Sequence, residues 1–207
     1  MDSVYSPVQK DRATFIETAE SSHGSVTLLE IELAPGGGNS AHYHTAFTER
    51  FEVVSGRLGV MVGGTERILS AGESALVERR QVHRFFNPTG DTTMFRIELR
   101  PASAGFEDAL RIAYRLGADG GTTAKGIPRS VLHLAVLSTM AETYATGFAA
   151  LLTPVLALIA ATPAGRRARA DLMARYVRKG EGDVSDREAR SGAGNYTPSS
   201  SRPNPLA

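Results

Sequence analysis

The sequence predicts a mainly β fold, an antiparallel sandwich or barrel, followed by a C-terminal α-helical extension. From about residue 13 to residue 100, short β-forming segments alternate with turns that contain glycine or proline. Many short strands at such spacing are typical of sandwiches and closed barrels. From residue 101 to residue 177 the apolar residues recur with helical periodicity instead. The expected strands are residues 25–33, 50–54, 57–62, 74–77 and 93–99.

Four helices are expected in the second zone. Residues 106–116 carry apolar side chains at helical spacing, and Ser130 is the N-cap candidate of a helix over residues 130–144. The segment 148–161 is apolar nearly all round, whereas 163–177 is more polar. Residues 131–140 and 148–161 are too apolar to lie exposed in a soluble monomer. We therefore expect a homodimer in which these helices cover the barrel mouth or the subunit interface. A membrane-associated hairpin is the alternative.

The composition divides the chain into four parts. Residues 1–20 are expected to form an N-terminal arm, 21–100 the β-barrel, and 101–178 a helical extension that packs on the barrel or on a dimer partner. Residues 179–207 are rich in serine, glycine, proline and charge, and such a segment buries too little apolar surface to order itself. A flexible tail is expected there.

The overall composition excludes several kinds of function. The 23 basic and 22 acidic residues nearly balance, so nothing in the net charge favours nucleic acid as a partner. The absence of cysteine excludes disulfides, iron–sulfur clusters, thiolate zinc sites and a cysteine nucleophile. Residues 1–10 contain no apolar run of the secretory type, and the apolar segment 148–162 is shorter than the ~20 residues that cross a bilayer. We expect a cytoplasmic protein without a membrane span.

Three histidines and one glutamate form the pattern that points to chemistry. His42 and His44 are two residues apart, so in a strand they project from the same face, and a bend over residues 45–48 can bring Glu49 to that side. His83 lies farther along the chain. If its segment is a neighbour of the first in the barrel, three imidazoles and one carboxylate converge on one point.

The spacing of these residues resembles the two motifs of the cupin superfamily. The first, G-x5-H-x-H-x4-E-x6-G, is present without a break from Gly36 to Gly56. The second is usually G-x5-P-x-G-x2-H-x3-N. Gly72, His83 and Asn87 match it, while residues 78 and 80 are Glu and Arg in place of Pro and Gly. Because proline fixes φ and glycine permits positive φ, the turn at 78–80 is expected to differ from the family norm.

The resemblance implies a cupin double-stranded β-helix, which is a jelly-roll barrel, with a metal ion near one mouth. The segment from 100 to 128 is also similar to single-domain cupins (monocupins) that carry a helical C-terminal extension. The implied ligands of one divalent ion per chain are His42, His44, Glu49 and His83. Imidazole and carboxylate ligands suit Fe, Mn, Ni, Cu or Zn, and we favour Fe(II). The alternative is an exposed polar strand face with an ordinary surface charge.

The expected function is that of a metal-dependent cupin enzyme acting on a small organic molecule. A non-haem Fe(II) dioxygenase or oxygenase, hence an oxidoreductase, is the first choice, with Glu49 as the candidate catalytic base. A metal-assisted isomerase, cyclase or hydrolase is one alternative, and a non-catalytic small-ligand binding or sensing cupin is another.

Four residues are candidates for substrate binding. Strand alternation places Phe85 and Asn87 on the face of His83, and Phe51 on the face of Glu49. Arg80 belongs to a group of arginines around His83, at positions 79, 80 and 84, that could neutralise an anionic substrate. The alternative for these arginines is a solvated loop. The remaining histidines, at positions 23 and 133, are expected to be structural or exposed.

Overall fold

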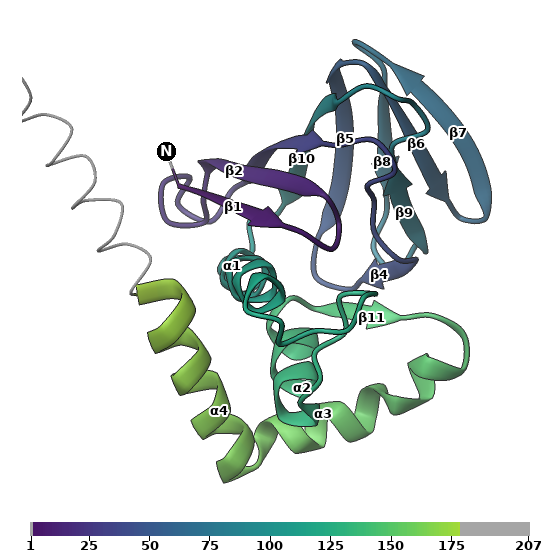
Figure 1. Cartoon of the computed structure of the whole chain (residues 1–207). Helices are drawn as coiled ribbons and strands as arrows, with labels where there is room; N and C mark the ends of the chain where they lie inside the picture. The colour runs from purple at the N-terminus through teal and green to yellow at the C-terminus, as the bar shows by residue number, and fades with distance from the viewer. Residues whose placement is uncertain (1, 179–207) are drawn as a thin grey trace, which may run out of the picture.

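Two antiparallel β-sheets pack face to face in the computed structural model, which describes residues 2–178, and the helices lie at one end of them (Figure 1). One sheet has the strand order β1-β2-β3-β10-β5-β8, and the other has the order β11-β4-β9-β6-β7. The first consists of β1 (Ser3–Ser6), β2 (Asp11–Glu17), β3 (Thr27–Leu33), β10 (Thr93–Arg100), β5 (Thr48–Ser55) and β8 (Ser74–Val77). The second consists of β11 (Thr143–Ala145), β4 (His42–His44), β9 (His83–Phe86), β6 (Arg57–Val62) and β7 (Thr65–Ser70).

Strand alternation builds the barrel core. Along β10 every second residue is buried, and Ile97 faces Leu29 on β3 and Phe51 on β5 across the sheet. Such rungs of apolar side chains point between the two sheets and interdigitate there. The mainly β fold with a helical extension, predicted from the sequence, is confirmed. Each of the five expected strands is present.

The segment expected as an N-terminal arm contributes β1 and β2 to the first sheet. β2 pairs with β3, and β1 pairs with β2. The alternating burial of β2 places Ala13 and Phe15 in the barrel core. The sheet therefore begins well before residue 21. The tail expected over residues 179–207 lies outside the described residues.

The helices form a second, smaller core beside the barrel. They are α1 (Ala104–Ala118), α2 (Val131–Met140), the short helix η1 (Gly147–Leu152), α3 (Thr153–Ala161), α4 (Pro163–Met173) and the single-turn η2 (Ala174–Arg178). The side chain of Ser130 caps α2, as predicted, and Ser103 caps α1 in the same way. The shared core consists of Ala109, Ile112, Leu116, Val136, Leu137, Met140, Leu172, Tyr176 and Val177.

Helix α1 connects the two cores. Its Glu107 is buried and accepts hydrogen bonds from the amide of Ala19, at 2.7 Å, and from the hydroxyl of Thr27, at 2.5 Å. About two turns further along, Tyr114 enters the barrel core and donates its hydroxyl to a carboxylate oxygen of Asp11, at 2.7 Å. The extension is thus fixed to the barrel by buried polar contacts as well as by apolar packing.

Asp11 is the buried carboxyl whose burial should be visible in the pH dependence of stability. Burial raises its pKa to about 7, against an ordinary value of 3.8. The folded protein therefore keeps a proton that the unfolded chain releases, so the free energy of unfolding falls as the pH rises from about 4 to about 7. Below this pH window the contribution of the raised Asp11 pKa to the free energy of unfolding is fully present, and above the window it is lost.

Replacement Asp11→Asn should remove this dependence. The difference in the free energy of unfolding between wild type and variant is expected to change by up to about 4 kcal/mol between pH 4 and pH 7.5, because one pKa unit corresponds to about 1.4 kcal/mol. Urea denaturation of both proteins at several pH values measures it. Parallel curves for the two proteins would show that Asp11 titrates normally in the folded state.

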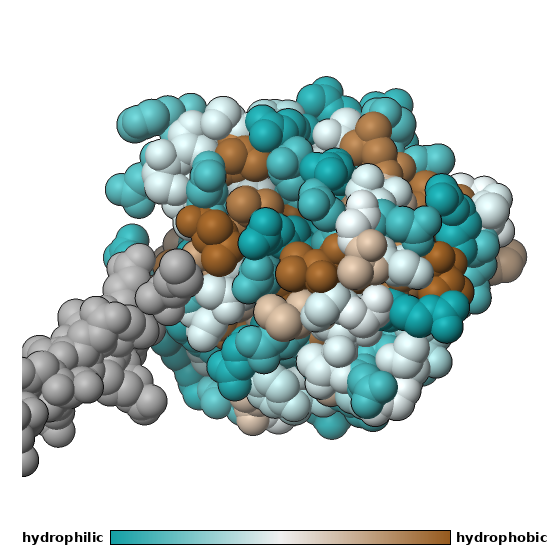
Figure 2. Space-filling view, turned by 90° about the horizontal axis from the view of Figure 1, so that it is seen from above, coloured by the Kyte–Doolittle hydropathy of each residue, from teal (hydrophilic) through white to brown (hydrophobic). Residues whose placement is uncertain are grey.

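Part of the helical extension has no cover within the described chain. We call Phe148, Leu151, Leu152, Val155 and Leu158 the apolar face. These five are among the twelve large hydrophobic side chains that are exposed in residues 2–178, and Phe148 is 92% exposed. On the opposite side of the molecule, seen from above in Figure 2, hydrophobic side chains lie in separate groups among hydrophilic ones. The apolar face, by contrast, is one continuous stretch of η1 and α3.

Within residues 2–178, no individual helix has the length and apolar composition of a membrane span. A bent pair, Gly147–Ala161 with Pro163–Arg178, meets those two criteria only when taken together, and its two arms are inclined at 82°.

Candidate metal centre

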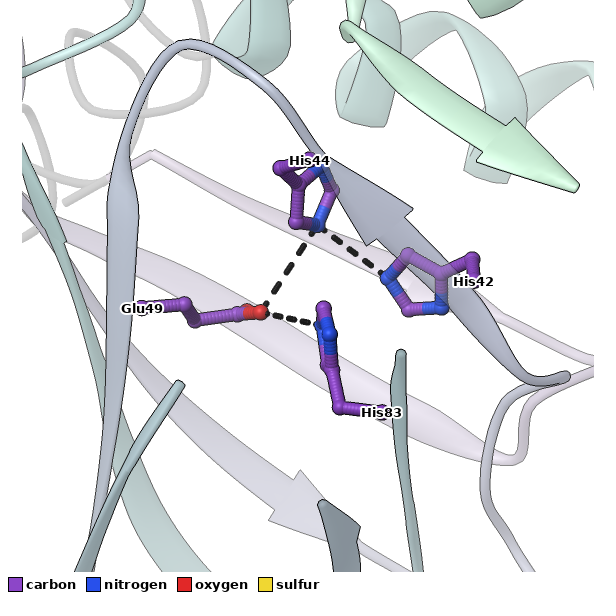
Figure 3. A group of neighbouring side chains, drawn as sticks. All are labelled: His42, His44, Glu49 and His83. Atoms are coloured by element: carbon purple, nitrogen blue, oxygen red, sulfur yellow. Dashed lines mark hydrogen bonds and ion pairs between the residues drawn. The ribbon is translucent and has the colours of Figure 1, made fainter. Parts of the chain in front are cut away.

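The predicted ligands come together from three strands at one end of the barrel (Figure 3). Strand β4 presents His42 and His44 on one face, as their spacing predicts. Strand β9 lies beside β4, and His83 is directly opposite His42 in the register. Glu49 follows the bend after β4 and lies near the start of β5, from which it points back toward the histidines.

The four side chains direct one ligand atom each toward a common point. The Nε2 atoms of His42 and His44 are 3.1 Å apart. The Oε2 atom of Glu49 lies 2.6 Å from Nε2 of His83 and 3.6 Å from Nε2 of His44. All four ligand atoms lie within 4.8 Å of one another. At metal–ligand distances near 2 Å, such a group can surround one ion with modest adjustment.

The outer nitrogen of each imidazole is held by a backbone carbonyl. Nδ1 of His42 lies 2.8 Å from the oxygen of Ser40, and Nδ1 of His83 lies 3.0 Å from that of Gln81. Nδ1 of His44 is 3.3 Å from the oxygen of Glu142. Since a carbonyl only accepts, Nδ1 is the protonated nitrogen and Nε2 keeps a free lone pair toward the centre. Metal-ligating histidines are commonly oriented in this way.

Two buried polar atoms of the cluster lack a hydrogen-bond partner within residues 2–178 and are placed to bind a metal ion. Oε2 of Glu49 and Nε2 of His83 have no hydrogen-bond partner of acceptable geometry in the described part of the chain, although they are only 2.6 Å apart. Their residues are 4% and 0% exposed. Leaving buried polar atoms without partners is costly. Both atoms point at the common centre, where a cation would satisfy them.

The protonation states in the cluster are set by burial and by mutual contact. Burial lowers the pKa of His42 to about 4, and it also lowers the pKa of His44. Burial by itself raises the pKa of Glu49, but the surrounding histidines outweigh it and the pKa falls. Burial acts to lower the pKa of His83, and the adjacent Glu49 carboxylate raises it above its ordinary value. Near neutral pH the cluster therefore presents an ionised carboxylate with neutral His42 and His44, the forms that bind metal.

The turn before His83 has an arginine in a glycine-type conformation. Arg80 stands at the motif position of glycine, and its φ is 65°, in the left-handed region that glycine permits. Its amide donates a hydrogen bond to the carbonyl oxygen of His44 at 2.6 Å. Arg80 thus takes a left-handed conformation despite its side chain, and this hydrogen bond helps to hold it there. That the turn at 78–80 differs from the family norm stays a prediction.

Replacement Arg80→Gly should therefore stabilise the protein. A left-handed φ costs a side-chain-bearing residue about 1 kcal/mol, so a gain of that size in the free energy of unfolding is expected. The matched control is Arg79→Gly, because Arg79 has no such φ and glycine there should only add flexibility to the unfolded chain. Thermal denaturation of both variants measures the two changes. Equal effects of the two substitutions would contradict the conformational explanation.

The predicted substrate-binding residues lie in different environments. Phe51 and Phe85 are buried inside the barrel with their rings 5.9 Å apart, and the Phe51 ring is 6.1 Å from that of His83. Asn87 is also buried, but its side chain holds a turn, donating to the oxygens of Leu33 and Asp91 and accepting from Thr89. Binding of substrate by these three residues stays a prediction.

The arginines and the other histidines do not belong to the cluster of four ligands. Arg79 and Arg80 are exposed. Arg84 pairs with Glu66 at 3.1 Å and lies over the ring of Phe86, at 4.9 Å. His23 is exposed in a turn, and His133 is half-buried on α2. Substrate binding by Arg80 also stays a prediction.

Two features of the structure were not anticipated from the sequence, a pair of contacts to His44 and a cavity outside the ligand cluster. The carbonyl of Glu142 and the hydroxyl of Thr143, at 3.2 Å, both contact Nδ1 of His44, although they are nearly a hundred residues away. A backbone carbonyl leaves no signature in a sequence, so only the pairing of β11 with β4 reveals the contact. A cavity of about 350 Å³ lies between β6, β7 and β8 and includes none of the four ligands.

Comparison with known proteins points to one family. A family model described as the cupin domain matches residues 29–97. A search of curated proteins found no match. Three similar solved structures are KdgF from Halomonas sp., a predicted oxalate decarboxylase from Thermotoga maritima and an RmlC-like cupin from Shewanella frigidimarina.

These structural likenesses are distant. The KdgF structure is 15% identical, with a TM-score of 0.45, over 50% of this chain and 89% of that one. The predicted oxalate decarboxylase is 16% identical, with a TM-score of 0.43, over 44% and 80% of the two chains. The RmlC-like cupin is 18% identical, with a TM-score of 0.43, over 50% and 86%.

Proposed function

Because the chain belongs to the cupin superfamily, with its cupin domain at residues 29–97, we propose that it is a metal-dependent enzyme acting on a small organic molecule. The observation that carries the proposal is the convergence of three imidazoles and one carboxylate, with their ligand atoms within 4.8 Å of one another. Two of these atoms are buried without hydrogen-bond partners among the described residues. Structural zinc sites are usually closed and rich in thiolate, which this set is not.

The proposed cofactor is one divalent ion per chain, held by His42, His44, Glu49 and His83. Fe(II) is favoured, and Mn, Ni, Zn and Cu remain compatible with nitrogen and carboxylate ligands. Bound Fe(II) would supply redox chemistry with dioxygen, which makes oxidative cleavage or hydroxylation of the substrate the proposed reaction and a dioxygenase the proposed class. Four protein ligands leave open positions on an ion that takes six.

The chain's own residues have distinct proposed roles around that ion. The three histidines fix its position through rings that backbone carbonyls already orient. Glu49 supplies the only negative charge of the ligand set and is the proposed base that accepts a substrate proton. Phe51 and Phe85 form the apolar wall beside His83 and keep water away from that side. Of the four ligands His42 is the least buried, so we place the approach of substrate at His42.

Nitric oxide binding tests the proposed Fe(II) chemistry without knowledge of the substrate. Nitric oxide occupies the open position that dioxygen requires and gives Fe(II) a characteristic electron paramagnetic resonance signal. The Fe(II)-loaded protein is expected to give this signal, and His83→Ala should abolish it. Fe(II)-loaded protein without the signal would overturn the oxygenase proposal.

We also propose that a second copy of the chain covers the apolar face, so that the protein is a homodimer. Residues 147–162 contain no charged side chain, so two such faces can meet without burying an unpaired charge. Light scattering without detergent should give the mass of two chains. Replacement Leu158→Glu, at a side chain that is 70% exposed, should shift the mass to one chain. A monomeric wild type would overturn the proposal, and recovery of the protein with membranes would favour the hairpin.

A further inference from the structure

We propose that the helical extension is part of the metal centre, in that Glu142 and Thr143 are positioning residues for His44. The proposal rests on the proposed metal site and extends it to a segment far outside the cupin domain. In Figure 3 the short strand β11 runs beside β4, the strand from which His42 and His44 project. Three observations support the proposal.

The first observation is the pairing of β4. Toward the barrel, β4 pairs with β9 at one position only, His42 with His83. Toward the extension it pairs with β11 at three positions, and Thr143 is directly opposite His44. A strand of three residues with one barrel pair has little to hold its orientation by itself. The extension therefore supplies most of the ladder that fixes two of the four ligands.

The second observation is the contact to the His44 ring. Its Nδ1 lies 3.3 Å from the carbonyl oxygen of Glu142 and 3.2 Å from the hydroxyl of Thr143. The Thr143 hydroxyl donates its own proton to the oxygen of Ala141, at 3.2 Å, so it can accept from Nδ1. Both acceptors keep the Nδ1 proton in place and direct the Nε2 lone pair toward the metal. For His42 and His83 this role falls to the carbonyls of Ser40 and Gln81, which belong to the cupin domain itself.

The third observation is the backbone of the segment between α2 and β11. Glu142 has a φ of 47°, a left-handed conformation that a glutamate adopts only when its surroundings hold it. Its side chain accepts a hydrogen bond from Thr45, one residue after His44, at 3.2 Å. The rings of Tyr43 and Tyr144 lie 5.4 Å apart on the outer face of the same strand pair. Contacts from Glu142 and Tyr144 thus hold β11 against β4.

These contacts make the metal affinity depend on the docking of the extension. Partners that orient a ligating histidine are usually worth ten- to hundredfold in metal affinity. By linkage, metal binding should in turn hold the segment from residue 141 to 145 on the barrel.

The test compares three variants of the full chain, with Zn²⁺ as the probe for affinity and Co²⁺ as the probe for geometry. Thr143→Val removes one of the two acceptors of Nδ1 of His44 and keeps the shape of the side chain, and Thr143→Ser retains the hydroxyl. Thr139→Val is the matched control, because the Thr139 hydroxyl contacts only carbonyls of its own helix, those of Ala135 and Val136, among its hydrogen bonds in the described chain. Competition with a chromogenic chelator gives the Zn²⁺ affinity, and the visible spectrum of Co²⁺ reports the ligand geometry.

Thr143→Val is expected to bind Zn²⁺ about tenfold more weakly and to alter the Co²⁺ spectrum, while Thr143→Ser and Thr139→Val stay near wild type. Equal affinities and spectra for Thr143→Val and Thr139→Val would overturn the positioning role, with the metal site itself intact. A wild type that binds neither ion would overturn the proposed function first, and the positioning role with it. The thermal stability of each metal-free variant separates a loss of affinity from a loss of folding.

Discussion

Replacement Glu49→Gln is expected to weaken divalent metal binding by more than about 100-fold, since loss of a ligand should exceed the ten- to hundredfold effect of losing a residue that only orients one. The substitution keeps the size of the side chain and removes its charge. Glu49 is buried, and its Oε2 atom lies 3.6 Å from Nε2 of His44 and 2.6 Å from Nε2 of His83. A neutral amide is a poor ligand among nitrogen donors, and its amino group would point a proton at the cation. Titration of the metal-free protein with Zn²⁺ measures the change.

The matched control for this prediction is Glu52→Gln. Glu52 lies on the same strand, β5, but it is only partly buried and pairs with Arg50 at 2.7 Å. Exposed ion pairs contribute little, so this variant should bind metal as the wild type does. Equal affinity of the Glu49 and Glu52 variants would mean that the carboxylate of Glu49 is not a ligand.

Replacement Phe51→Ala is expected to lower the free energy of unfolding by about 3–5 kcal/mol, the usual range for removing a phenylalanine from a core. Phe51 is fully buried between Phe85 and Phe95, with ring centroids 5.9 and 6.2 Å away. These rings fill the space between the sheets directly beneath His83. Little can collapse into the resulting hole, because strands from both sheets form its walls.

The control for Phe51 is Leu76→Ala on β8. The Leu76 side chain is 54% exposed, and a change at such a position usually costs less than about 1 kcal/mol. Chemical denaturation of the two variants gives both values. If Phe51→Ala keeps wild-type stability, then Phe51 is part of an open binding cavity and not of the packed core. A large loss of stability is compatible with a further role for Phe51 as the wall of the site. Unchanged stability would require that role, because the side chain would then line an open cavity.

Much of the fold could be predicted because strand alternation leaves a clear trace in the sequence. Every second residue of β10 is buried, and those from Phe95 to Leu99 are apolar; β3 shows the same alternation from Leu29 to Leu33. The strands that were missed carry weaker signals. β4 has only three residues, and β7 has one buried side chain in six. For β1 and β2, polar side chains alternate with few large apolar ones, so the segment did not read as a pair of strands.

For the candidate site too, one part could be predicted from the sequence and another part could not. The convergence of the four ligands follows from the spacing of His42, His44 and Glu49 and from the resemblance that includes His83. The orientation of the rings does not follow from spacing, since it depends on backbone carbonyls such as that of Glu142. The conformation of Arg80 was also beyond prediction, because a hydrogen bond to the His44 carbonyl overrides the usual preference of arginine. Tertiary contacts decided each of these points.

The helical extension shows a similar limit. Ser130 marked the start of α2, but the helix expected over residues 130–144 ends at Met140, and Thr143–Ala145 form β11. The sequence did not show which apolar segment would find a place in the core. α2 buries Val136, Leu137 and Met140, whereas α3 buries none of its side chains within residues 2–178. Because α3 is apolar on all sides, its sequence does not show that Leu156 and Ile159 become half-buried while Val155 and Leu158 stay exposed.

The stoichiometry of metal binding to the metal-free protein tests the central claim most directly. A calorimetric titration with Zn²⁺ should show one saturable site per chain. His83→Ala should remove that site, while His23→Ala, at an exposed turn histidine, should leave it unchanged. Absence of a saturable site in the wild type, or its persistence in His83→Ala, would contradict the assignment of a metal centre to His42, His44, Glu49 and His83.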